Sequence, residues 1–371
     1  MEGGEERPQP RPEGPTEEAP ACAPAGNHCA SEETLESALK AFPYYKPLNV
    51  LGRGNFGVVL RALDTRTSPS APGESADAPP PPCREVAIKL LPRGDFVRLY
   101  RTYIKREMVH HSSLRHPMVI SLREVFLTAG SIGMVMECAR GGDLQAHIAA
   151  RPERRLSEGE ARWFFQQLAI GLDYCHQRGV ANRDLKLDNL LLDVGGGGRP
   201  ILKMCDFGYS KHEMNSMAKT VVGTVCYMAP EVLLGYRSYD AKVADMWSLG
   251  VVLFAMLFGC FPFRGQGRHY ISSVIKGRTR IPPGVQVSSQ ALDLLGRLLV
   301  FEVGGRASMQ QVLDHPWFLQ DLPPGALDLN AALLTRPLLL EEVHYRIDHM
   351  VERAAAMGHD DEDPTVVTLV A

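Results

Sequence analysis

The stretch between residues 180 and 231 constrains the fold of this chain more than any other part of the sequence. Three short motifs follow one another there: Arg183-Asp184-Leu185-Lys186-Leu187-Asp188-Asn189, Cys205-Asp206-Phe207-Gly208 and Ala229-Pro230-Glu231. These side chains suit phosphoryl transfer, because the Asp184 carboxylate can accept a hydroxyl proton. Asn189 and Asp206 supply the oxygen ligands that Mg²⁺ prefers on the phosphates of a nucleotide. One Asp-x-x-x-x-Asn alone would be weak, but three motifs in this order are specific.

A glycine-rich motif precedes this stretch and predicts a phosphate-binding loop. It reads Leu51-Gly52-Arg53-Gly54-Asn55-Phe56-Gly57-Val58-Val59, and glycines let a backbone approach phosphates without a Cβ in the way. The motif alone would also fit a Rossmann turn or an ordinary hairpin. A Rossmann unit requires a helix next, whereas residues 58–63 have the pattern of a strand. A second strand, Val86-Ala87-Ile88-Lys89, then supplies a lysine for the α- and β-phosphates.

The segment from Asp95 to His111 has the pattern of a helix, and Glu107 is the carboxylate that we expect to pair with Lys89 and aim it. The alternative is an ordinary surface glutamate. The neighbouring histidines have no Cys or Asp partner at metal-ligand spacing, so we interpret them as packing residues.

A strand over residues 132–136 is expected to end at Met136, beside the nucleotide pocket. Glu137-Cys138-Ala139 follows this strand, and the family resemblance described below implies that it forms a hinge whose backbone groups hydrogen-bond adenine. Asp143 follows at the rim of the site. The apolar periodicity from Glu158 to His176 predicts a buried helix that leads into the catalytic stretch.

Composition excludes several classes of function. The formal net charge is -3, which does not indicate a nucleic-acid-binding protein. No signal peptide is recognisable, and the longest apolar run, Val251 to Phe263, is too short to span a bilayer, so a buried helix is the better interpretation. The eight cysteines are scattered, which is typical of reduced thiols in a cytoplasmic or nuclear protein.

The remaining segments define the domain organisation. Residues 1–42 are rich in Pro, Glu, Ala and Gly and are expected to be disordered, as is the Ser/Ala/Pro-rich insert at 67–83. The glycines at 195–198 predict a hairpin turn. Residues 337–357 carry a helical stripe of apolar side chains, Leu340, Val343, Ile347, Met350 and Ala354, and a short acidic tail begins at His359.

These motifs together resemble a eukaryotic protein kinase over residues 45–318. Within that superfamily the chain is most similar to the plant sucrose-nonfermenting-related protein kinases of the osmotic-stress subclass. The residues that carry this resemblance are Ser113-Leu114-Arg115-His116-Pro117, Phe164-Phe165-Gln166-Gln167-Leu168, Arg183-Asp184-Leu185-Lys186-Leu187, Cys205-Asp206-Phe207-Gly208-Tyr209-Ser210-Lys211, Lys242-Val243-Ala244-Asp245 and His315-Pro316-Trp317-Phe318-Leu319.

The resemblance implies an α+β, two-lobed protein kinase fold. An N-lobe would cover residues 43–136, a C-lobe 137–318 and a regulatory segment 319–371. It also implies that the protein uses ATP with Mg²⁺ and acts on protein substrates. Ser/Thr specificity is implied as well, and Lys186, two residues after Asp184, matches the Ser/Thr rather than the Tyr pattern. An upstream kinase and a type 2C protein phosphatase are implied partners. No membrane or nucleic-acid partner is expected.

It further implies roles for individual residues. ATP would lie under Leu51, Gly52, Gly54 and Gly57, between Val59, Ala87 and Leu191, beside Met136, Glu137 and Cys138. Asp184, Lys186, Lys89 and Glu107 would be catalytic, and Asn189 and Asp206 would hold Mg²⁺. Asp143, Asp188 and Thr224 would line the substrate site. Thr220 is the expected activating phosphorylation site, with Ser216 secondary; the alternative for Thr220 is an ordinary loop threonine, and for Asp143 a carboxylate at a helix start.

Three further contacts are expected from the family. Asp245 would brace the catalytic-loop backbone, Arg306 would pair with Glu231, and the helix at 337–357 would dock on the helix that carries Glu107. That helix could instead bind a partner protein or a second copy of the chain. Gly304-Gly305-Arg306 departs from the family's Ala-Lys-Arg pattern but keeps the arginine.

Asn182 stands where the family usually has histidine. We expect it in an internal column with His111, Leu122 and Phe207, hydrogen-bonded to backbone near Phe207. This departure motivates the main alternative, a pseudokinase scaffold that binds partners without transferring phosphate. A small-molecule kinase of related fold is the other, but Ala229-Pro230-Glu231 is typical of protein kinases.

Overall fold

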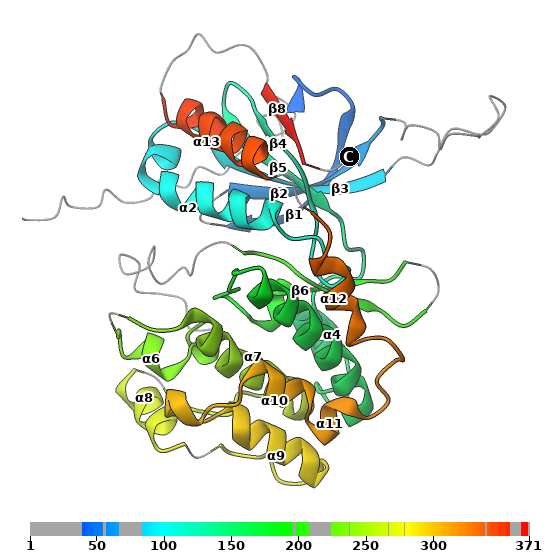
Figure 1. Cartoon of the computed structure of the whole chain (residues 1–371), viewed down its shortest axis with the longest axis vertical. Coiled ribbons are helices and arrows are strands. Elements are labelled where there is room, and N and C mark those ends of the chain that lie inside the picture. Colours follow the sequence, from blue (N-terminus) through cyan, green and yellow to red (C-terminus); the bar gives the residue numbers. More distant parts are fainter. Residues whose placement is uncertain are drawn as a thin grey trace, which may run out of the picture.

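The computed structural model describes residues 39–54, 57–66, 84–195, 198–207, 224–236, 238–265, 267–277, 279–337, 340–356 and 365–369. Two lobes are visible, a sheet with two helices and a mostly helical body below it (Figure 1). The expected α+β, two-lobed architecture is therefore confirmed. The segments expected to be disordered at 67–83 and over most of 1–42 lie outside the described residues.

Six strands of the described chain form the antiparallel sheet of the N-lobe, in the order β1-β2-β3-β5-β4-β8. Their bounds are β1 Tyr45–Gly54, β2 Gly57–Asp64, β3 Arg84–Pro92, β4 Leu122–Leu127, β5 Ser131–Glu137 and β8 Thr365–Thr368. The central strands are almost fully buried, as expected for strands that are covered on both faces.

Two helices lie on one face of this sheet, α2 (Asp95–Ser112) and α13 (Glu341–Ala355). Figure 1 shows them side by side. Ile347, Met350 and Ala354 of α13 are fully buried in one apolar cluster with Ile104 and Met108 of α2. The apolar stripe read from the sequence is thus the face by which α13 docks on α2. The helix begins at Glu341, later than the expected start at residue 337, and ends at Ala355.

The C-terminal end of the described chain contains a strand that was not predicted. Residues 365–368 form β8, which pairs with β4 at the edge of the sheet, and Val367 is buried between α13 and the sheet. Just after the strand, the Leu369 carbonyl accepts a hydrogen bond from Arg115 (2.6 Å), which also holds this end of the chain. The expected acidic run that begins at His359 lies outside the described residues, and the segment that follows it is a strand. The physical reason is that β4 would otherwise leave an unpaired edge.

The ordered N-lobe also begins earlier than residue 43. Leu39 and Phe42 are both 3% exposed and pack with Tyr45 and Phe126, with the Phe42 and Phe126 rings 4.5 Å apart. These two side chains fall within the segment that was expected to be disordered. Burying them removes apolar surface from water, which explains why the chain is fixed there.

The C-lobe is built around α4 (Glu158–Gln177) and α7 (Ala241–Phe258). The start of α4 is set by a capping box in which Ser157 and Glu160 satisfy each other's backbone N–H groups. α7 ends at Gly259, whose φ of 65° suits glycine, and a Cβ there would lie 2.2 Å from the Arg154 carbonyl oxygen.

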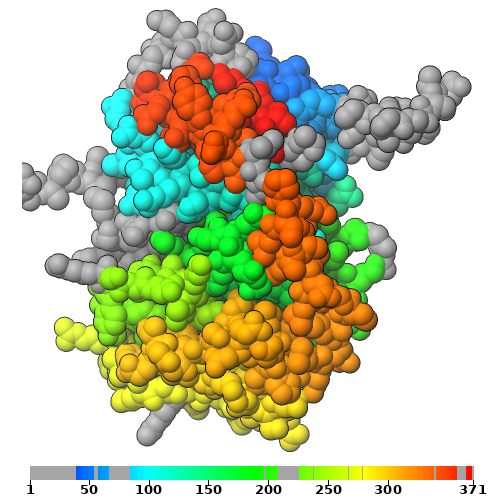
Figure 2. Space-filling view, viewed as in Figure 1, coloured from blue at the N-terminus to red at the C-terminus, as the bar shows by residue number. Residues whose placement is uncertain are grey.

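Smaller elements surround these two helices. They are α3 Leu144–Ala149, η1 Leu187–Asn189, β6 Leu190–Asp193, β7 Ile201–Met204, η2 Thr224–Tyr227, α6 Pro230–Leu233, α8 Arg268–Ile275, α9 Ser289–Leu298, η3 Val303–Gly305, α10 Met309–Leu313, α11 Pro316–Leu319 and α12 Asp328–Leu334. β6 and β7 form the expected hairpin, although part of its turn lies outside the described residues. Figure 2 shows α12 on the C-lobe and α13 on the N-lobe along one face.

Among the described helices, α7 has the length and apolar composition of a membrane-crossing segment. Most of that stretch is buried against the rest of the protein, and Trp247, Leu253 and Met256 are fully covered. It is the buried core helix expected from the apolar run that begins at Val251.

Candidate active site

The catalytic stretch is held by Asp245 at the start of α7. Its Oδ2 accepts from the N–H of Asn182 (2.8 Å), and its Oδ1 accepts from the N–H of Arg183 (2.8 Å). His176, at the end of α4, also contacts the Asp245 carboxylate at 2.8 Å. The expected brace is therefore present. It stabilises a left-handed residue, since the φ of Arg183 is 65°, a conformation that must be compensated by its surroundings.

Asp184, Lys186 and Asn189 form one buried polar cluster. Lys186 Nζ lies 2.6 Å from Asp184 Oδ2, and Asn189 Nδ2 donates to the same oxygen at 3.0 Å and to the Asp184 carbonyl at 2.9 Å. All three side chains are less than a tenth exposed. The cluster therefore fixes the direction of the Asp184 carboxylate and places a cation beside it.

The expected metal ligands, Asn189 and Asp206, are brought together by the β6–β7 hairpin. Leu190 pairs with Met204, and just beyond this pair the N–H of Cys205 donates to the Asn189 carbonyl (3.0 Å). Because Asn189 uses its amide nitrogen on Asp184, its amide oxygen remains for a cation, and no described residue donates to that oxygen. Asp206 has a φ of 60°, a strained value typical of functional sites. The two residues thus fit Mg²⁺.

Lys89 of β3 and Glu107 of α2 form the expected ion pair, with 2.5 Å between Nζ and Oε1. Burial alone would lower the pKa of Lys89, but the charges of Glu107 and Asp206 outweigh burial and hold the pKa of the lysine above its ordinary value. The lysine therefore stays protonated, which suits contact with phosphates.

The side chains that we expect to contact the nucleotide lie on adjacent strands of the sheet. Val59 pairs with Lys89, and Ala87 pairs with Met136. Gly52 faces open space, so a ligand can approach its backbone, whereas a Cβ on Gly57 would lie 2.0 Å from the Leu90 carbonyl oxygen. Gly57 is thus required by the packing of the hairpin itself.

The remaining expected nucleotide contacts come from neighbouring elements. Leu51 and Gly54 lie on β1, Leu191 on β6, and Cys138 just after β5. The Glu137 carboxylate is bound to Lys203 (2.7 Å). We therefore expect Glu137 to contact a nucleotide through its backbone.

The sequence was also compared with known proteins. Residues 45–318 match the protein kinase domain family. The serine/threonine-protein kinase SAPK4 of Oryza sativa subsp. japonica is 38% identical over 326 residues, which cover 84% of each chain. The serine/threonine-protein kinase SRK2G of Arabidopsis thaliana is 41% identical over 292 residues, or 76% of each chain. The chain belongs to the serine/threonine protein kinases. Such kinases use ATP, typically with Mg²⁺, and act on proteins.

A buried ion pair supports the activation segment of this kinase. Arg306 donates through both terminal nitrogens to Glu231, at 2.7 and 2.9 Å, as expected. The arginine side chain is fully buried. Removing one partner of such a pair would cost about 3–5 kcal/mol, because the other charge would be left uncompensated.

Asn182 is 1% exposed in the structure. Its Oδ1 accepts from the N–H of Asp184 (3.3 Å). The expected hydrogen bond to backbone is therefore present, and its partner is Asp184; no bond from Asn182 to Phe207 is found among the described residues. Its Nδ2 is buried without a hydrogen-bond partner among the described residues. The ring of Phe207 lies 5.5 Å from that of His111, as expected for the internal column.

Of the expected substrate-side residues, Asp143 and Asp188 have described side chains. Asp143 accepts from the Ala146 N–H (2.7 Å) and so caps α3, which bears out its structural role. Asp188 is exposed in η1. Thr224 begins η2, and its side chain is outside the described residues, as are Thr220 and Ser216.

Sequence reasoning missed one contributor to the site. His176 contacts Asp245, yet it lies on a helix that carried only an apolar signal. Its position at the last turn of α4 next to the catalytic stretch was the available clue.

Proposed function

We propose that this kinase is catalytically active, transferring the γ-phosphoryl group of ATP to Ser or Thr hydroxyls of protein substrates in stress signalling. The observation that carries the proposal is the buried cluster of Asp184, Lys186 and Asn189, with the Lys89–Glu107 pair also formed. Both arrangements are needed for transfer. A pseudokinase scaffold would have no use for either.

Each residue has a separate task in this mechanism. Asp184 orients the substrate hydroxyl and accepts its proton, and Lys186 stabilises negative charge on the moving phosphoryl group. Lys89, aimed by Glu107, binds the α- and β-phosphates. Asn189 and Asp206 would hold Mg²⁺, which when bound neutralises phosphate charge. The protein acts mainly by positioning and by fixed charges.

Regulation and location complete the proposal. We infer that an upstream kinase phosphorylates Thr220 and that a type 2C protein phosphatase reverses this step. Both inferences rest on the similarity to the osmotic-stress subclass of plant kinases. The scattered cysteines support a cytoplasmic or nuclear location.

The direct test is phosphate transfer from ATP to a panel of Ser/Thr peptides, measured beside Asp184→Ala. The variant should lose nearly all transfer but still bind nucleotide, because the proton acceptor is separate from the groups that hold phosphate. Equal activity in both proteins would contradict the mechanism and would indicate a contaminating kinase.

A further inference from the structure

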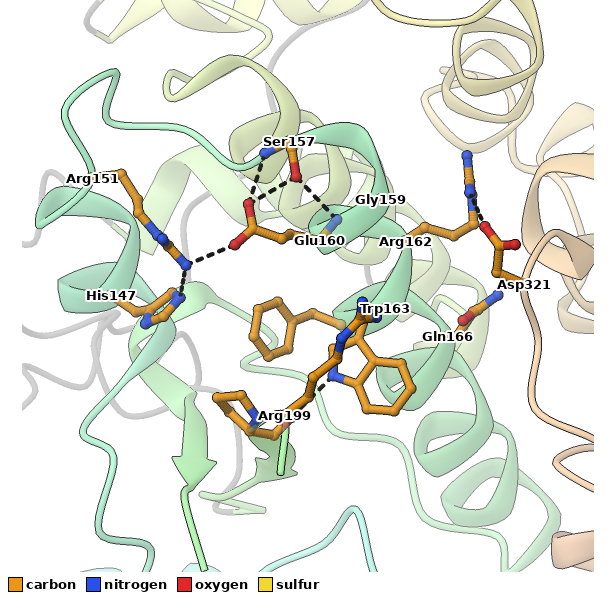
Figure 3. Close-up of a pocket in the computed structure, with 12 residues that line it drawn as sticks. His147, Arg151, Ser157, Gly159, Glu160, Arg162, Trp163, Gln166, Arg199 and Asp321 are labelled. Atoms are coloured by element: carbon orange, nitrogen blue, oxygen red, sulfur yellow. Dashed lines mark hydrogen bonds and ion pairs between the residues drawn. The ribbon is translucent and has the colours of Figure 1, made fainter. Parts of the chain in front are cut away.

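A cavity of about 720 Å³ lies on the C-lobe, away from the active-site cluster. It is bounded by α3, the first half of α4, the turn before β7 and the segment after α11. Figure 3 shows Arg151 and His147 on one side, Arg162 and Asp321 on the other, and Trp163 with Arg199 between them. Its volume is within the usual range for ligand pockets, about 300–1,000 Å³.

The wall formed by α3 and the start of α4 is held by hydrogen bonds. Arg151 bridges Glu160 (2.7 Å) and His147 (3.1 Å), and Glu160 accepts from the hydroxyl of Ser157 (2.8 Å). At the floor, Trp163 Nε1 donates to the Pro200 carbonyl (3.1 Å). These contacts fix the indole ring and the position of the turn before β7.

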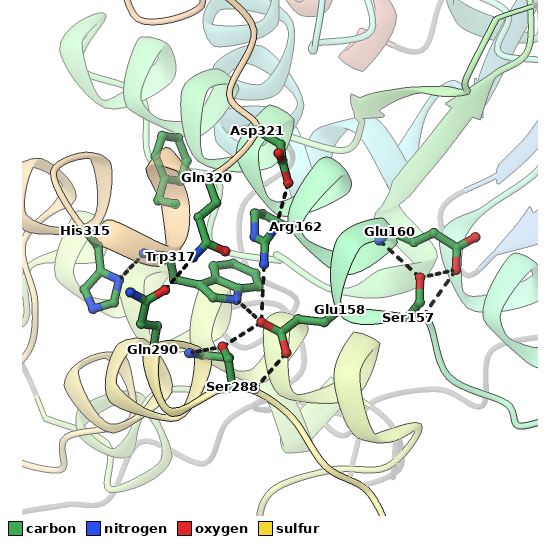
Figure 4. Close-up of polar contacts among 12 residues, drawn as sticks. Ser157, Glu158, Glu160, Arg162, Ser288, Gln290, His315, Trp317, Gln320 and Asp321 are labelled. Atoms are coloured by element: carbon green, nitrogen blue, oxygen red, sulfur yellow. Dashed lines mark hydrogen bonds and ion pairs between the residues drawn. The ribbon is translucent and has the colours of Figure 1, made fainter.

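The opposite wall is equally rigid. Arg162 lies between Asp321 (3.0 Å) and Glu158 (3.3 Å). Glu158 in turn accepts from Trp317 Nε1 (2.7 Å) and from the Ser288 hydroxyl (2.6 Å), which joins α4 to α9 and α11 (Figure 4). The cavity is therefore preformed, so a ligand would lose little free energy by ordering it.

The charged side chains that line the cavity are not all paired with one another. Both lining carboxylates are already engaged, Glu160 by Arg151 and Asp321 by Arg162. Arg199 is the exposed lining arginine with no carboxylate partner among the described residues, and its guanidinium lies over the Trp163 ring, 5.6 Å from the centroid. Burial and the charge of Arg151 lower the pKa of His147, so that ring is neutral. The exposed Arg199 cation therefore lies beside the Trp163 ring with no carboxylate of the described residues to neutralise it directly.

We propose that this cavity is a docking site for an acidic peptide segment of a protein substrate, one that carries a large apolar side chain among its carboxylates. The apolar side chain would pack on the partly exposed Trp163, and a carboxylate would pair with Arg199. The proposal rests on the protein kinase activity proposed above, and it adds a second contact with the substrate.

The position of the cavity fits a substrate that binds at two places. Asp143 at the rim of the active site caps α3, and His147 of the cavity lies one turn further along that helix. One helical turn is about 5.4 Å. A docked segment could therefore continue along α3 toward Asp143 and present its Ser or Thr to Asp184.

Trp163 provides a direct measure of occupancy. The chain has three tryptophans, and Trp247 and Trp317 are both fully buried, so acrylamide should quench mainly Trp163. The probe is a peptide of alternating Glu and Leu, about nine residues long, or ~30 Å when extended. We expect it to protect the fluorescence from acrylamide and to bind saturably. Peptides with Lys in place of Glu, or Ser in place of Leu, should not.

Arg199→Glu tests the ionic contact, because it reverses the unmatched charge without touching the buried walls. It should weaken binding of the Glu/Leu peptide about tenfold or more. Arg336→Glu is the matched control, since Arg336 is exposed and does not line the cavity; it should bind as the wild type does. Equal affinity for the Glu/Leu and Lys/Leu peptides, or no effect of Arg199→Glu, would overturn the proposal.

A kinase assay separates the docking site from the proposed activity. A short Ser/Thr peptide phosphorylated by the wild type is compared with the same peptide joined to the Glu/Leu segment. Docking predicts a lower KM for the joined substrate, with kcat unchanged, and Arg199→Glu should remove this advantage while phosphorylating the short peptide normally. Equal KM values for the two substrates would refute docking alone. No transfer to either substrate, with the Glu/Leu peptide still bound, would refute the kinase activity alone.

Discussion

Lys105 of α2 and Asp348 of α13 form an ion pair of 2.6 Å between Nζ and Oδ2. Arg101 and Glu352 repeat this contact one turn along, at 3.0 Å. Both pairs are partly exposed and so contribute little stability. They flank the buried stripe that contains Ile347, and together they set how α13 lies on the helix that carries Glu107. The family-based expectation of an internal brace is thus confirmed in its geometry.

Ile347→Asp should undock α13 from α2. Ile347 is fully buried, and placing a carboxylate there should lower the free energy of unfolding by ~3 kcal/mol or more. Because α2 would lose its support, the Lys89–Glu107 pair should form less often, and basal activity should fall as well. Thermal unfolding and peptide phosphorylation measure the two effects.

Tyr345→Asp is the control for this experiment. Tyr345 lies on the same helix but is 71% exposed, so the substitution adds the same charge without burying it. Its melting temperature and activity should match the wild type. If Ile347→Asp also left both unchanged, α13 would not act as an internal brace.

Much of this arrangement could be predicted because its signals are local. The apolar spacing of α13 identifies its buried face, and the motifs from Asp184 to Asp206 carry their chemistry in short fixed spacings. β8 could not be predicted in this way. Its four residues are β-branched and so favour a strand, but their partner, the edge of β4, lies far away in the sequence and could not be identified from the local pattern. The cavity at Trp163 was missed for the same reason, since its lining comes from several separate elements.

Asn182→His should leave kcat equal or raise it. The asparagine amide nitrogen is buried without a partner among the described residues, which is unfavourable by about 1–3 kcal/mol. By the resemblance to other kinases, an imidazole would fill more of the internal column expected at this position, and it could still accept from the Asp184 N–H. Steady-state kinetics with a peptide substrate measure the change.

Asn182→Asp serves as the opposite control. It places a third carboxylate beside those of Asp184 and Asp245, so repulsion should lower activity. A large loss of activity in Asn182→His would instead mean that the amide has a specific role in the transfer step.

Thr220→Ala should prevent activation. Arg183 precedes the proton acceptor Asp184, so its cation can pair with a phosphate on the activation segment. We expect activity to fall at least ~10-fold, as it should in phosphatase-treated wild type. Ser216→Ala should have a smaller effect. Mass spectrometry of the active enzyme identifies the modified residue, and full activity in Thr220→Ala would contradict the assignment.

Asp143→Asn separates two roles of one side chain. Asp143 caps α3 by accepting from the Ala146 N–H, and asparagine caps helices about as well, so stability should not change. The substitution removes only the charge that we expect to attract Arg or Lys three residues before the phosphorylated Ser or Thr. A positional peptide library should therefore show a basic preference in the wild type and a weaker one in Asp143→Asn. Asp143→Ala should lose both the preference and ~1 kcal/mol of stability.

Asp188→Asn should weaken the same preference, because Asp188 is exposed near the catalytic cluster. A wild-type enzyme with no basic preference at that position would show that Asp143 acts only as a helix cap.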